Sequence, residues 1–185
     1  MPKQILFVQG AGESVHDQWD DKLVRSLERE LDAGYSVRYP RMPDEADPHY
    51  SVWKTALLSE FEKLETAAVL IGHSVGGTVL LNVLGEQRLK IMPSALILIA
   101  APFFGEGGWH SDDIHPRTGL AESLPAGMPV FLYHGTEDET VPFAHVHLHA
   151  KALPQATVRV LAHRDHQLNN DLSEVAREIQ SLFSH

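Results

Sequence analysis

The chain has 185 residues, of which 43% are hydrophobic and 22% are charged, a composition typical of a globular domain and not of a disordered chain. It contains no cysteine, which excludes disulfides, thiolate metal sites and a cysteine nucleophile. The net charge of −10 disfavours nucleic acids and anionic membranes as partners.

The beginning of the chain does not resemble a targeting signal. Only four strongly apolar residues, 5–8, precede a glycine loop, and this run is too short for the core of a signal peptide. No later apolar run approaches the length of a membrane span. We therefore expect one domain over residues 1–185, a cytoplasmic location and no association with membranes.

Short apolar runs alternate with segments of helical periodicity along the whole chain. The runs predict strands at residues 4–8, 35–39, 67–71, 95–100, 130–133 and 157–161. Between them, apolar side chains recur at helical spacing, as in the series Trp19, Leu23, Leu27 and Leu31 and the series Trp53, Leu57, Phe61 and Leu64. This alternation predicts an α/β fold in three layers, with a parallel sheet of about six strands between helices.

Several residues in these helical segments have ordinary structural explanations. Trp19 and Trp53 continue the apolar stripes, so we expect both in the core. Asp17, Asp20 and Asp21 lie where the first helix begins, and acidic side chains there complement the helix dipole.

The segment Gly72-His73-Ser74-Val75-Gly76 follows an apolar run directly and precedes a helical segment. This is the Gly-x-Ser-x-Gly pattern in a strand, turn and helix context, in which the serine sits on a strained turn with its hydroxyl exposed. The glycines allow strand and helix backbones to pass close together. We therefore predict that Ser74 is a nucleophile and that His73 supports the turn without acting as a base.

A serine hydroxyl needs a base to remove its proton and a third group to orient that base. The loop after residues 130–133 resembles the acid loop of α/β hydrolases, Gly-x-x-Asp-x-x-Val-Pro, and this likeness indicates Asp138 rather than Glu137 or Glu139. The loop after residues 157–161 offers His163 and His166. His166 adjoins the last helix and is favoured as the base, while His163 is expected on the surface.

These motifs together resemble the retinoblastoma-binding serine hydrolases, which are small α/β hydrolases. The likeness runs from residue 4 to residue 183 and includes the 72–76 motif, the Asp138 loop through Pro142, and residues 165–168. The resemblance implies a serine hydrolase with the triad Ser74, His166 and Asp138, acting on small ester-type substrates without metal or cofactor. It leaves open an amidase or thioesterase, and a protein-binding scaffold with little catalysis.

The oxyanion hole of such an enzyme needs two backbone N–H donors. One is expected from Val75, the residue after the nucleophile. The other should come from the loop after the first strand, and Ala11 is the predicted donor. Relatives often carry His-Gly in this loop, whereas this chain has Gln9-Gly10, which leaves the shape of the loop open.

Residues 103–127 break the regular alternation, and loops of this length are commonly functional. Larger α/β hydrolases carry a cap domain at this position, so a segment of this size predicts no cap domain, an open site and a preference for short acyl chains. Phe103 and Trp109 could contribute to substrate binding there, or simply pack within the loop. His145, His147 and His149 suggest a metal site, but helical geometry turns His147 away from the other two, so none is expected.

Overall fold

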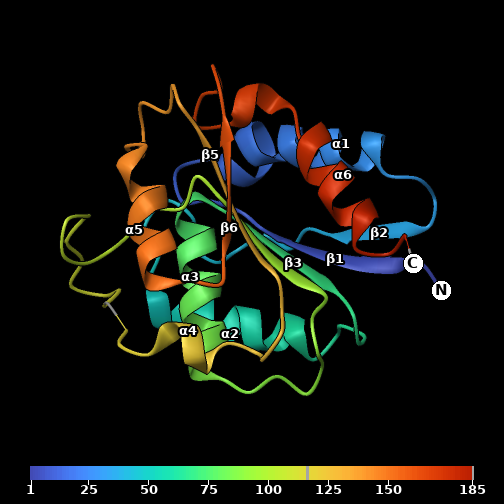
Figure 1. The fold of residues 1–185 in the computed structure, drawn as a ribbon, viewed down its shortest axis with the longest axis horizontal. Coiled ribbons are helices and arrows are strands. Elements are labelled where there is room, and N and C mark those ends of the chain that lie inside the picture. The colour runs from blue at the N-terminus through green and yellow to red at the C-terminus, as the bar shows by residue number, and fades with distance from the viewer. Residues whose placement is uncertain (116, 185) are drawn as a thin grey trace.

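The computed structural model describes residues 1–115 and 117–184, and within these residues six parallel strands form one sheet in the order β2-β1-β3-β4-β5-β6 (Figure 1). The strands are β1 (Lys3–Val8), β2 (Tyr35–Arg38), β3 (Val69–His73), β4 (Ala95–Ile99), β5 (Val130–Gly135) and β6 (Thr157–Leu161). Each lies where the apolar runs predicted a strand, with small shifts at the ends. The predicted α/β class and parallel sheet are therefore confirmed.

Helices cover both faces of the sheet (Figure 1). Helices α1 (Asp21–Glu30) and α6 (Ser173–Ser181) contact each other on one face. Helices α2 (Tyr50–Phe61), α3 (Ser74–Glu86), α4 (Leu120–Ser123) and α5 (Ala144–Ala152) lie on the other. Two short turns complete the set, η1 (Val15–Asp20) before α1 and η2 (Leu168–Asn170) before α6.

Two apolar cores follow from the alternation of side chains along the central strands. Leu6, Leu70 and Leu96 point toward α2 and α3, whereas Ile5, Val69 and Ile97 point toward α1 and α6. Each strand of the centre is thus buried on both faces, which explains why β1, β3 and β4 appear in the sequence as continuous apolar runs.

The crossing of β3, α3 and β1 depends on two glycines. A Cβ on Gly72 would lie 2.4 Å from the Cα of Gly77, and a Cβ on Gly76 would lie 1.9 Å from the carbonyl oxygen of Gln9. Neither distance is possible for non-bonded atoms, so only glycine permits this approach. The close approach places the start of α3 directly beside the loop that follows β1.

The structure corrects the prediction for the start of the first helix. Residues Val15–Asp20 form a π-helical turn, which is wider than an α-helical one and breaks the 3.6-residue period. Trp19 is consequently 51% exposed and not in the core, while Asp20 is fully buried and not a surface acid. The prediction for Trp53 was right, since its side chain is completely buried.

The described residues between β4 and β5 form turns, an isolated bridge between Phe104 and Trp109, and the short helix α4; residue 116 of this predicted functional loop lies outside them. Within residues 1–115 and 117–184, none of the helices has both the length and the apolar character that crossing a bilayer requires.

Candidate active site

The site lies at the point where the order in which the chain adds strands to the sheet reverses. Strands β1 and β3 are neighbours, but the chain leaves β1 toward β2 on one side and leaves β3 toward β4 on the other. Open α/β sheets bind ligands at the carboxyl ends of strands near such a point. The loop after β1 and the start of α3 meet here, and the loops after β5 and β6 join them.

Ser74 occupies the turn between β3 and α3. Its φ is +52°, a left-handed conformation that is strained for a residue with a side chain. The residue is 8% exposed and lines a surface pocket. The turn holds its hydroxyl at the end of the sheet, as the motif predicted.

Hydrogen bonds connect the side chains of Ser74, His166 and Asp138 in series. His166 Nε2 lies 3.1 Å from Ser74 Oγ, and His166 Nδ1 lies 2.8 Å from Asp138 Oδ2. The carboxylate of Asp138 can only accept a hydrogen bond from His166 Nδ1, so Nδ1 carries the proton. Nε2 is therefore left as an acceptor facing the serine hydroxyl.

Asp138 is held in place by its own loop and by a second histidine. Its Oδ1 accepts hydrogen bonds from the N–H groups of Thr140 and Val141, at 2.9 and 2.8 Å. His134 Nε2 lies 3.2 Å from Oδ2 and 2.9 Å from the carbonyl oxygen of Val141, so its N–H is shared between them. These contacts fix the carboxylate that faces His166.

The protonation states of this series follow from burial and hydrogen bonding. Burial opposes the charge of Asp138, but hydrogen bonds from His134 and His166 more than offset it, so the pKa of Asp138 lies well below its usual range. Burial also lowers the pKa of His166, and the charge of His73 lowers it further, against the opposing effect of Asp138. The imidazole of His166 is therefore neutral at physiological pH.

The alternative histidine and acids lie away from the serine. The His163 side chain is 85% exposed, and its Nδ1 lies 2.7 Å from Glu137 Oε1. Glu137 and Glu139 line the pocket at its rim, with no contact to His166. Of the two candidate bases, the structure thus brings His166 to Ser74 and leaves His163 on the surface.

The two predicted backbone donors come from different segments, the start of α3 and the loop after β1. Val75 is in the first turn of α3, where N–H groups have no partner within the helix. Ala11 lines the pocket, whereas the neighbouring Gly10 N–H donates to Asp20 Oδ2 at 2.7 Å. In the described part of the chain, the hydrogen bonds leave the Ala11 N–H without an acceptor.

Gln9 holds the loop after β1, in which relatives often carry His-Gly. The residue is fully buried, and its Oε1 accepts from the Met42 N–H at 2.9 Å. Its Nε2 donates to Glu45 Oε2 at 2.6 Å and to the carbonyl oxygen of Gly10 at 3.2 Å. The amide therefore fixes the loop that carries Gly10 and Ala11.

A pocket of about 610 Å³ opens over Ser74. One wall comes from the loop after β1 and the η1 turn, and the other from the loops after β5 and β6. Its lining comprises Gly10, Ala11, Val15, Trp19, His73, Ser74, Glu137, Glu139, Thr140, Asp165, His166 and Gln167. Sequence reasoning missed Trp19, because a π-helical turn has no distinctive sequence pattern and the residue fitted the apolar stripe of α1.

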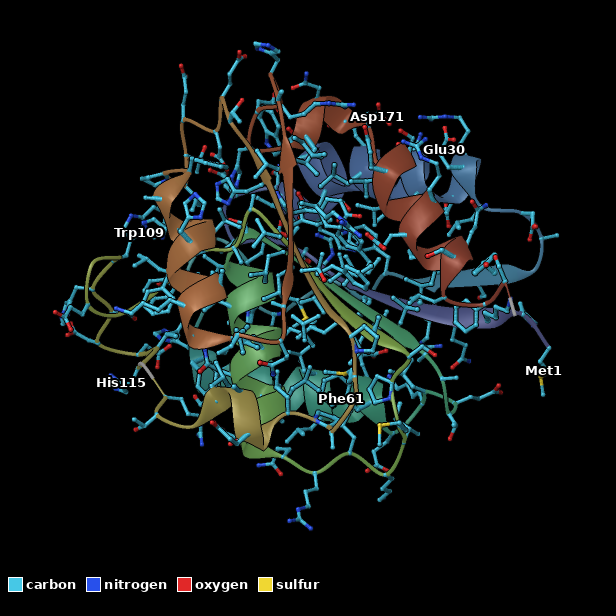
Figure 2. All side chains as sticks on the ribbon, in the orientation of Figure 1. Met1, Glu30, Phe61, Trp109, His115 and Asp171 are labelled. Carbon is cyan, nitrogen blue, oxygen red and sulfur yellow. The ribbon has the colours of Figure 1, made fainter. Side chains whose placement is uncertain are left out.

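Phe103 and Trp109, for which the sequence left substrate binding and loop packing open, are not among the residues that line this pocket. The Trp109 N–H donates to the Phe103 carbonyl oxygen, so the segment closes on itself. The Trp109 ring packs edge-on against Phe104 and His145, and Figure 2 shows it beside α5. These contacts turn the loop toward α5 and away from Ser74.

The three histidines of α5 have separate environments. His145 Nδ1 accepts from the Phe103 N–H at 2.8 Å, and His149 Nε2 lies 3.2 Å from the Pro102 carbonyl oxygen. Both are buried, while His147 is exposed on another side of the helix. The two buried rings thus support the segment after β4.

A further polar group next to the serine consists of His73, Asp20 and Gln167. The sequence indicated no role at the site for Asp20 or Gln167. His73 Nδ1 lies 2.9 Å from Asp20 Oδ2, and His73 Nε2 lies 3.0 Å from the carbonyl oxygen of His166. Gln167 Nε2 donates to Asp20 Oδ1 at 3.2 Å. Nothing distinguished Asp20 from Asp17 and Asp21, because its burial depends on the local winding of η1.

Comparison with solved structures shows the same fold in several proteins. The ydeN gene product of B. subtilis matches with a TM-score of 0.74 and 20% identity, over 99% of this chain and 100% of the other. Arabidopsis thaliana SOBER1 matches with a TM-score of 0.69 and 12% identity over the whole of both chains. Est1E from Butyrivibrio proteoclasticus gives 0.68 and 17%, over 97% and 86%.

Sequence comparison gives a family but no close relative. No curated protein is significantly similar to this chain. A family model described as the alpha/beta hydrolase family matches residues 5–178, which includes every strand from β1 to β6 apart from the first residues of β1. With this match and the nucleophile turn at the expected position, the chain belongs to the alpha/beta hydrolase family.

Proposed function

We propose that this protein is a serine hydrolase that cleaves small ester-type substrates through an acyl-enzyme on Ser74. The observation that carries the proposal is the hydrogen-bonded series Ser74–His166–Asp138 beneath an open pocket. A hydroxyl, a neutral imidazole and a buried carboxylate in this order are the groups that nucleophilic acyl transfer requires.

In the first half of the reaction, Ser74 Oγ attacks the carbonyl carbon of the substrate while His166 Nε2 takes the hydroxyl proton. Asp138 accepts a hydrogen bond from Nδ1 and stabilises the imidazolium that forms. The tetrahedral intermediate then collapses, the bond to the leaving group breaks, and Nε2–H protonates that group. Ser74 is left as an ester of the acyl group.

The negative charge of the tetrahedral oxygen is stabilised by the N–H groups of Val75 and Ala11. The use of Gly10 N–H by Asp20 supports Ala11 as the donor from its loop. Removing one donor of this kind typically costs about 3 kcal/mol of transition-state stabilisation. Both donors are backbone groups, so the hole depends on the shape of the two loops and not on side-chain identity.

In the second half, a water molecule replaces the leaving group. His166 Nε2 takes a proton from this water, whose oxygen attacks the acyl carbon. The second tetrahedral intermediate breaks its bond to Ser74 Oγ, and His166 returns the proton to the serine. The acid product leaves and the enzyme is restored without a metal or cofactor entering the sequence.

The finer resemblance to retinoblastoma-binding serine hydrolases is part of this proposal. It is supported by the motif at residues 72–76, the Asp138 loop and residues 165–168. Within this group an amide or thioester substrate would use the same side chains, and a protein partner would use the same scaffold. We favour ester over amide hydrolysis because an alcohol is a better leaving group than an amine, and the comparison with thioesters is made by the test below.

The test is hydrolysis of matched ester, thioester and anilide substrates with the same short acyl group. The proposal expects ester turnover that Ser74→Ala abolishes. Ser59→Ala, which removes an exposed serine of α2 far from the pocket lining, serves as the control and should retain full activity. Equal turnover by wild type and Ser74→Ala would contradict the proposal, and faster thioester or anilide cleavage would redirect it to those substrates.

A further inference from the structure

We propose that Asp20 and His73 form a buried carboxylate–imidazolium pair that positions the loop of His166 and the loop of Ala11 around Ser74. The inference rests on the proposed hydrolase function for its kinetic consequences, but the charge state of the pair is a separate property. Both residues act through other groups, so they are positioning residues and take no part in bond breaking. Their side chains are 0% and 1% exposed.

The proton inventory of His73 gives the charge of the ring. Its Nε2 lies 3.0 Å from the carbonyl oxygen of His166, an atom that only accepts, so Nε2 carries a proton. Its Nδ1 lies 2.9 Å from Asp20 Oδ2. If Nδ1 carried no proton, its lone pair would face a lone pair of Asp20 Oδ2, which is unfavourable unless Asp20 itself is protonated.

The other contacts of Asp20 show that it is the ionised partner. Its Oδ2 also accepts the Gly10 N–H at 2.7 Å, and its Oδ1 accepts the side-chain amide of Gln167 at 3.2 Å. Each oxygen therefore already accepts from one donor other than His73, which is the pattern of a carboxylate. His73 Nδ1 must then carry the second proton of an imidazolium.

The direction of both pKa shifts agrees with this hydrogen-bond pattern. Burial opposes charge on both groups, yet the charge and hydrogen bond of Asp20 raise the pKa of His73 above its usual value. The charge and hydrogen bond of His73, with the Gly10 N–H, likewise lower the pKa of Asp20. Each partner supplies the compensation that the other needs in the interior.

The pair connects the segments that must converge on the serine. Asp20 comes from η1 and holds Gly10, which precedes Ala11, while His73 adjoins Ser74 in the chain. Through its Nε2–H, His73 holds the carbonyl group of His166, and Gln167 is held through Asp20. A 1 Å misplacement of reacting groups can cost about 100-fold in rate, so this anchoring bears directly on turnover.

The pair also places a fixed positive charge next to the base. The rings of His73 and His166 are 4.8 Å apart. A second positive charge on His166 is disfavoured at this distance, which helps the base stay neutral. Two carboxyl groups act directly on these rings, Asp20 on His73 and Asp138 on His166. The remaining titratable groups around them are His134, which contacts Asp138, and the pocket-lining Glu137, Glu139 and Asp165.

The charge state is tested by nitrogen NMR of the histidine side chains in the full protein, with His73 assigned through its own backbone amide. We expect both His73 nitrogens to carry protons at about pH 8, in wild type and in Ser74→Ala alike. A His73 ring with one bare nitrogen at that pH overturns the proposal. The measurement needs no substrate turnover and is repeated in a variant without the Ser74 hydroxyl, so its result stands whether or not the hydrolase proposal holds.

The positioning role is tested by the pH dependence of ester hydrolysis. His73→Asn should lower kcat about 10- to 100-fold with little change in KM. It should also move the acid limb of kcat/KM upward by about one pH unit, because the cation is lost while Asp20 remains. A purely structural role would lower stability and leave this limb in place, and that result would overturn the proposal.

The variant Asp20→Asn tests the contribution of the carboxylate to the pair. It removes the anion and with it the reason for His73 to be charged, so kcat should fall about 10- to 100-fold with a smaller shift of the acid limb than in His73→Asn. Asp21→Asn is the matched control, since Asp21 is the next residue and pairs with Arg25 at the surface. Equal kcat values for Asp20→Asn and Asp21→Asn would contradict the positioning role.

Discussion

At the scale of single residues, His166 combines the contacts that a general base needs. Its Nδ1–H is held by Asp138 and its Nε2 faces Ser74, while its carbonyl oxygen is held by His73. Ring and backbone are thus fixed independently. Because burial and the nearby charge of His73 lower its pKa, the ring is uncharged at neutral pH, with its one proton on Nδ1, and Nε2 is free to accept another.

The pH profile of ester hydrolysis follows from this lowered pKa. Only the neutral imidazole accepts the serine proton, so kcat/KM should rise with pH as His166 loses its proton and then level off. Because the folded-state pKa lies below the usual value, the midpoint should fall below about pH 6.5. Steady-state kinetics from acid to neutral pH check this, and a flat profile or a midpoint above neutrality would contradict the assignment.

The placement of residues could be predicted from the sequence where a motif fixes backbone position. Ser74 lies on a turn with a fixed spacing of glycines, and Asp138 and His166 follow strand ends that meet at one edge. Prediction failed for Trp19 and Asp20, because the winding of one six-residue turn decides which of them points inward. It left Phe103 and Trp109 open between substrate binding and loop packing, because a loop without periodicity gives no indication of the helix against which it packs.

At the scale of elements, the close crossing of α3 and β1 determines where the serine sits. Gly76→Ala would place a Cβ against the Gln9 carbonyl oxygen, a rigid backbone atom, and should lower the free energy of unfolding by about 3 kcal/mol. A Cβ from Gly85→Ala, in the same helix, would meet the flexible ends of the Leu120 and Arg117 side chains and should change the free energy of unfolding by about 1 kcal/mol or less. Urea unfolding of both variants compares them directly; equal stabilities would show that the crossing adapts.

The η1 turn gives Trp19 a different function from Trp53, although both occupy helical stripes in the sequence. Trp53→Ala removes a fully buried ring and should cost about 3–5 kcal/mol of unfolding free energy. Trp19→Ala should leave stability within about 0.5 kcal/mol, because the ring is half exposed. It should instead raise KM for an aromatic ester about fivefold, the equivalent of ~1 kcal/mol of apolar contact.

Denaturation curves and steady-state kinetics on the two tryptophan variants supply both readouts. A large loss of stability in Trp19→Ala would return that residue to the core, where the apolar periodicity had placed it. An unchanged KM would remove it from the substrate-binding wall.

Elements themselves were the most predictable part of the chain. The central strands are apolar because both faces of the sheet are covered there, so each appears as a run that the sequence displays directly. Their ends shifted by small amounts, since hydrogen bonding with neighbours and not composition decides where a strand stops. His73 therefore ends β3 instead of starting the turn.

At the scale of the whole molecule, the short connection between β4 and β5 leaves the pocket uncovered by a separate domain. Its described part contains turns and α4 and packs toward α5, and the pocket walls come from four loops at the sheet edge. Because the pocket is open to solvent, the far end of a long acyl group would remain in water. We therefore predict a preference for small substrates.

A series of esters with one leaving group and acyl chains of increasing length checks this consequence. Turnover per enzyme, expressed as kcat/KM, should be highest for the short chains and should not rise with added methylene groups, each of which would bring ~0.8 kcal/mol only if buried. A steady increase with chain length would reveal an apolar channel that the pocket lining does not contain. Activity on the soluble short esters provides the internal control.

The most direct test of the account is covalent labelling of Ser74 by a fluorophosphonate, followed by peptide mass spectrometry. We predict one modified residue, Ser74, with labelling that disappears in Ser74→Ala and slows at least about 100-fold in His166→Asn. Ser59→Ala should label at the wild-type rate. Modification of another serine, or equally rapid labelling of Ser74 without the imidazole, would contradict the claim that His166 activates this hydroxyl.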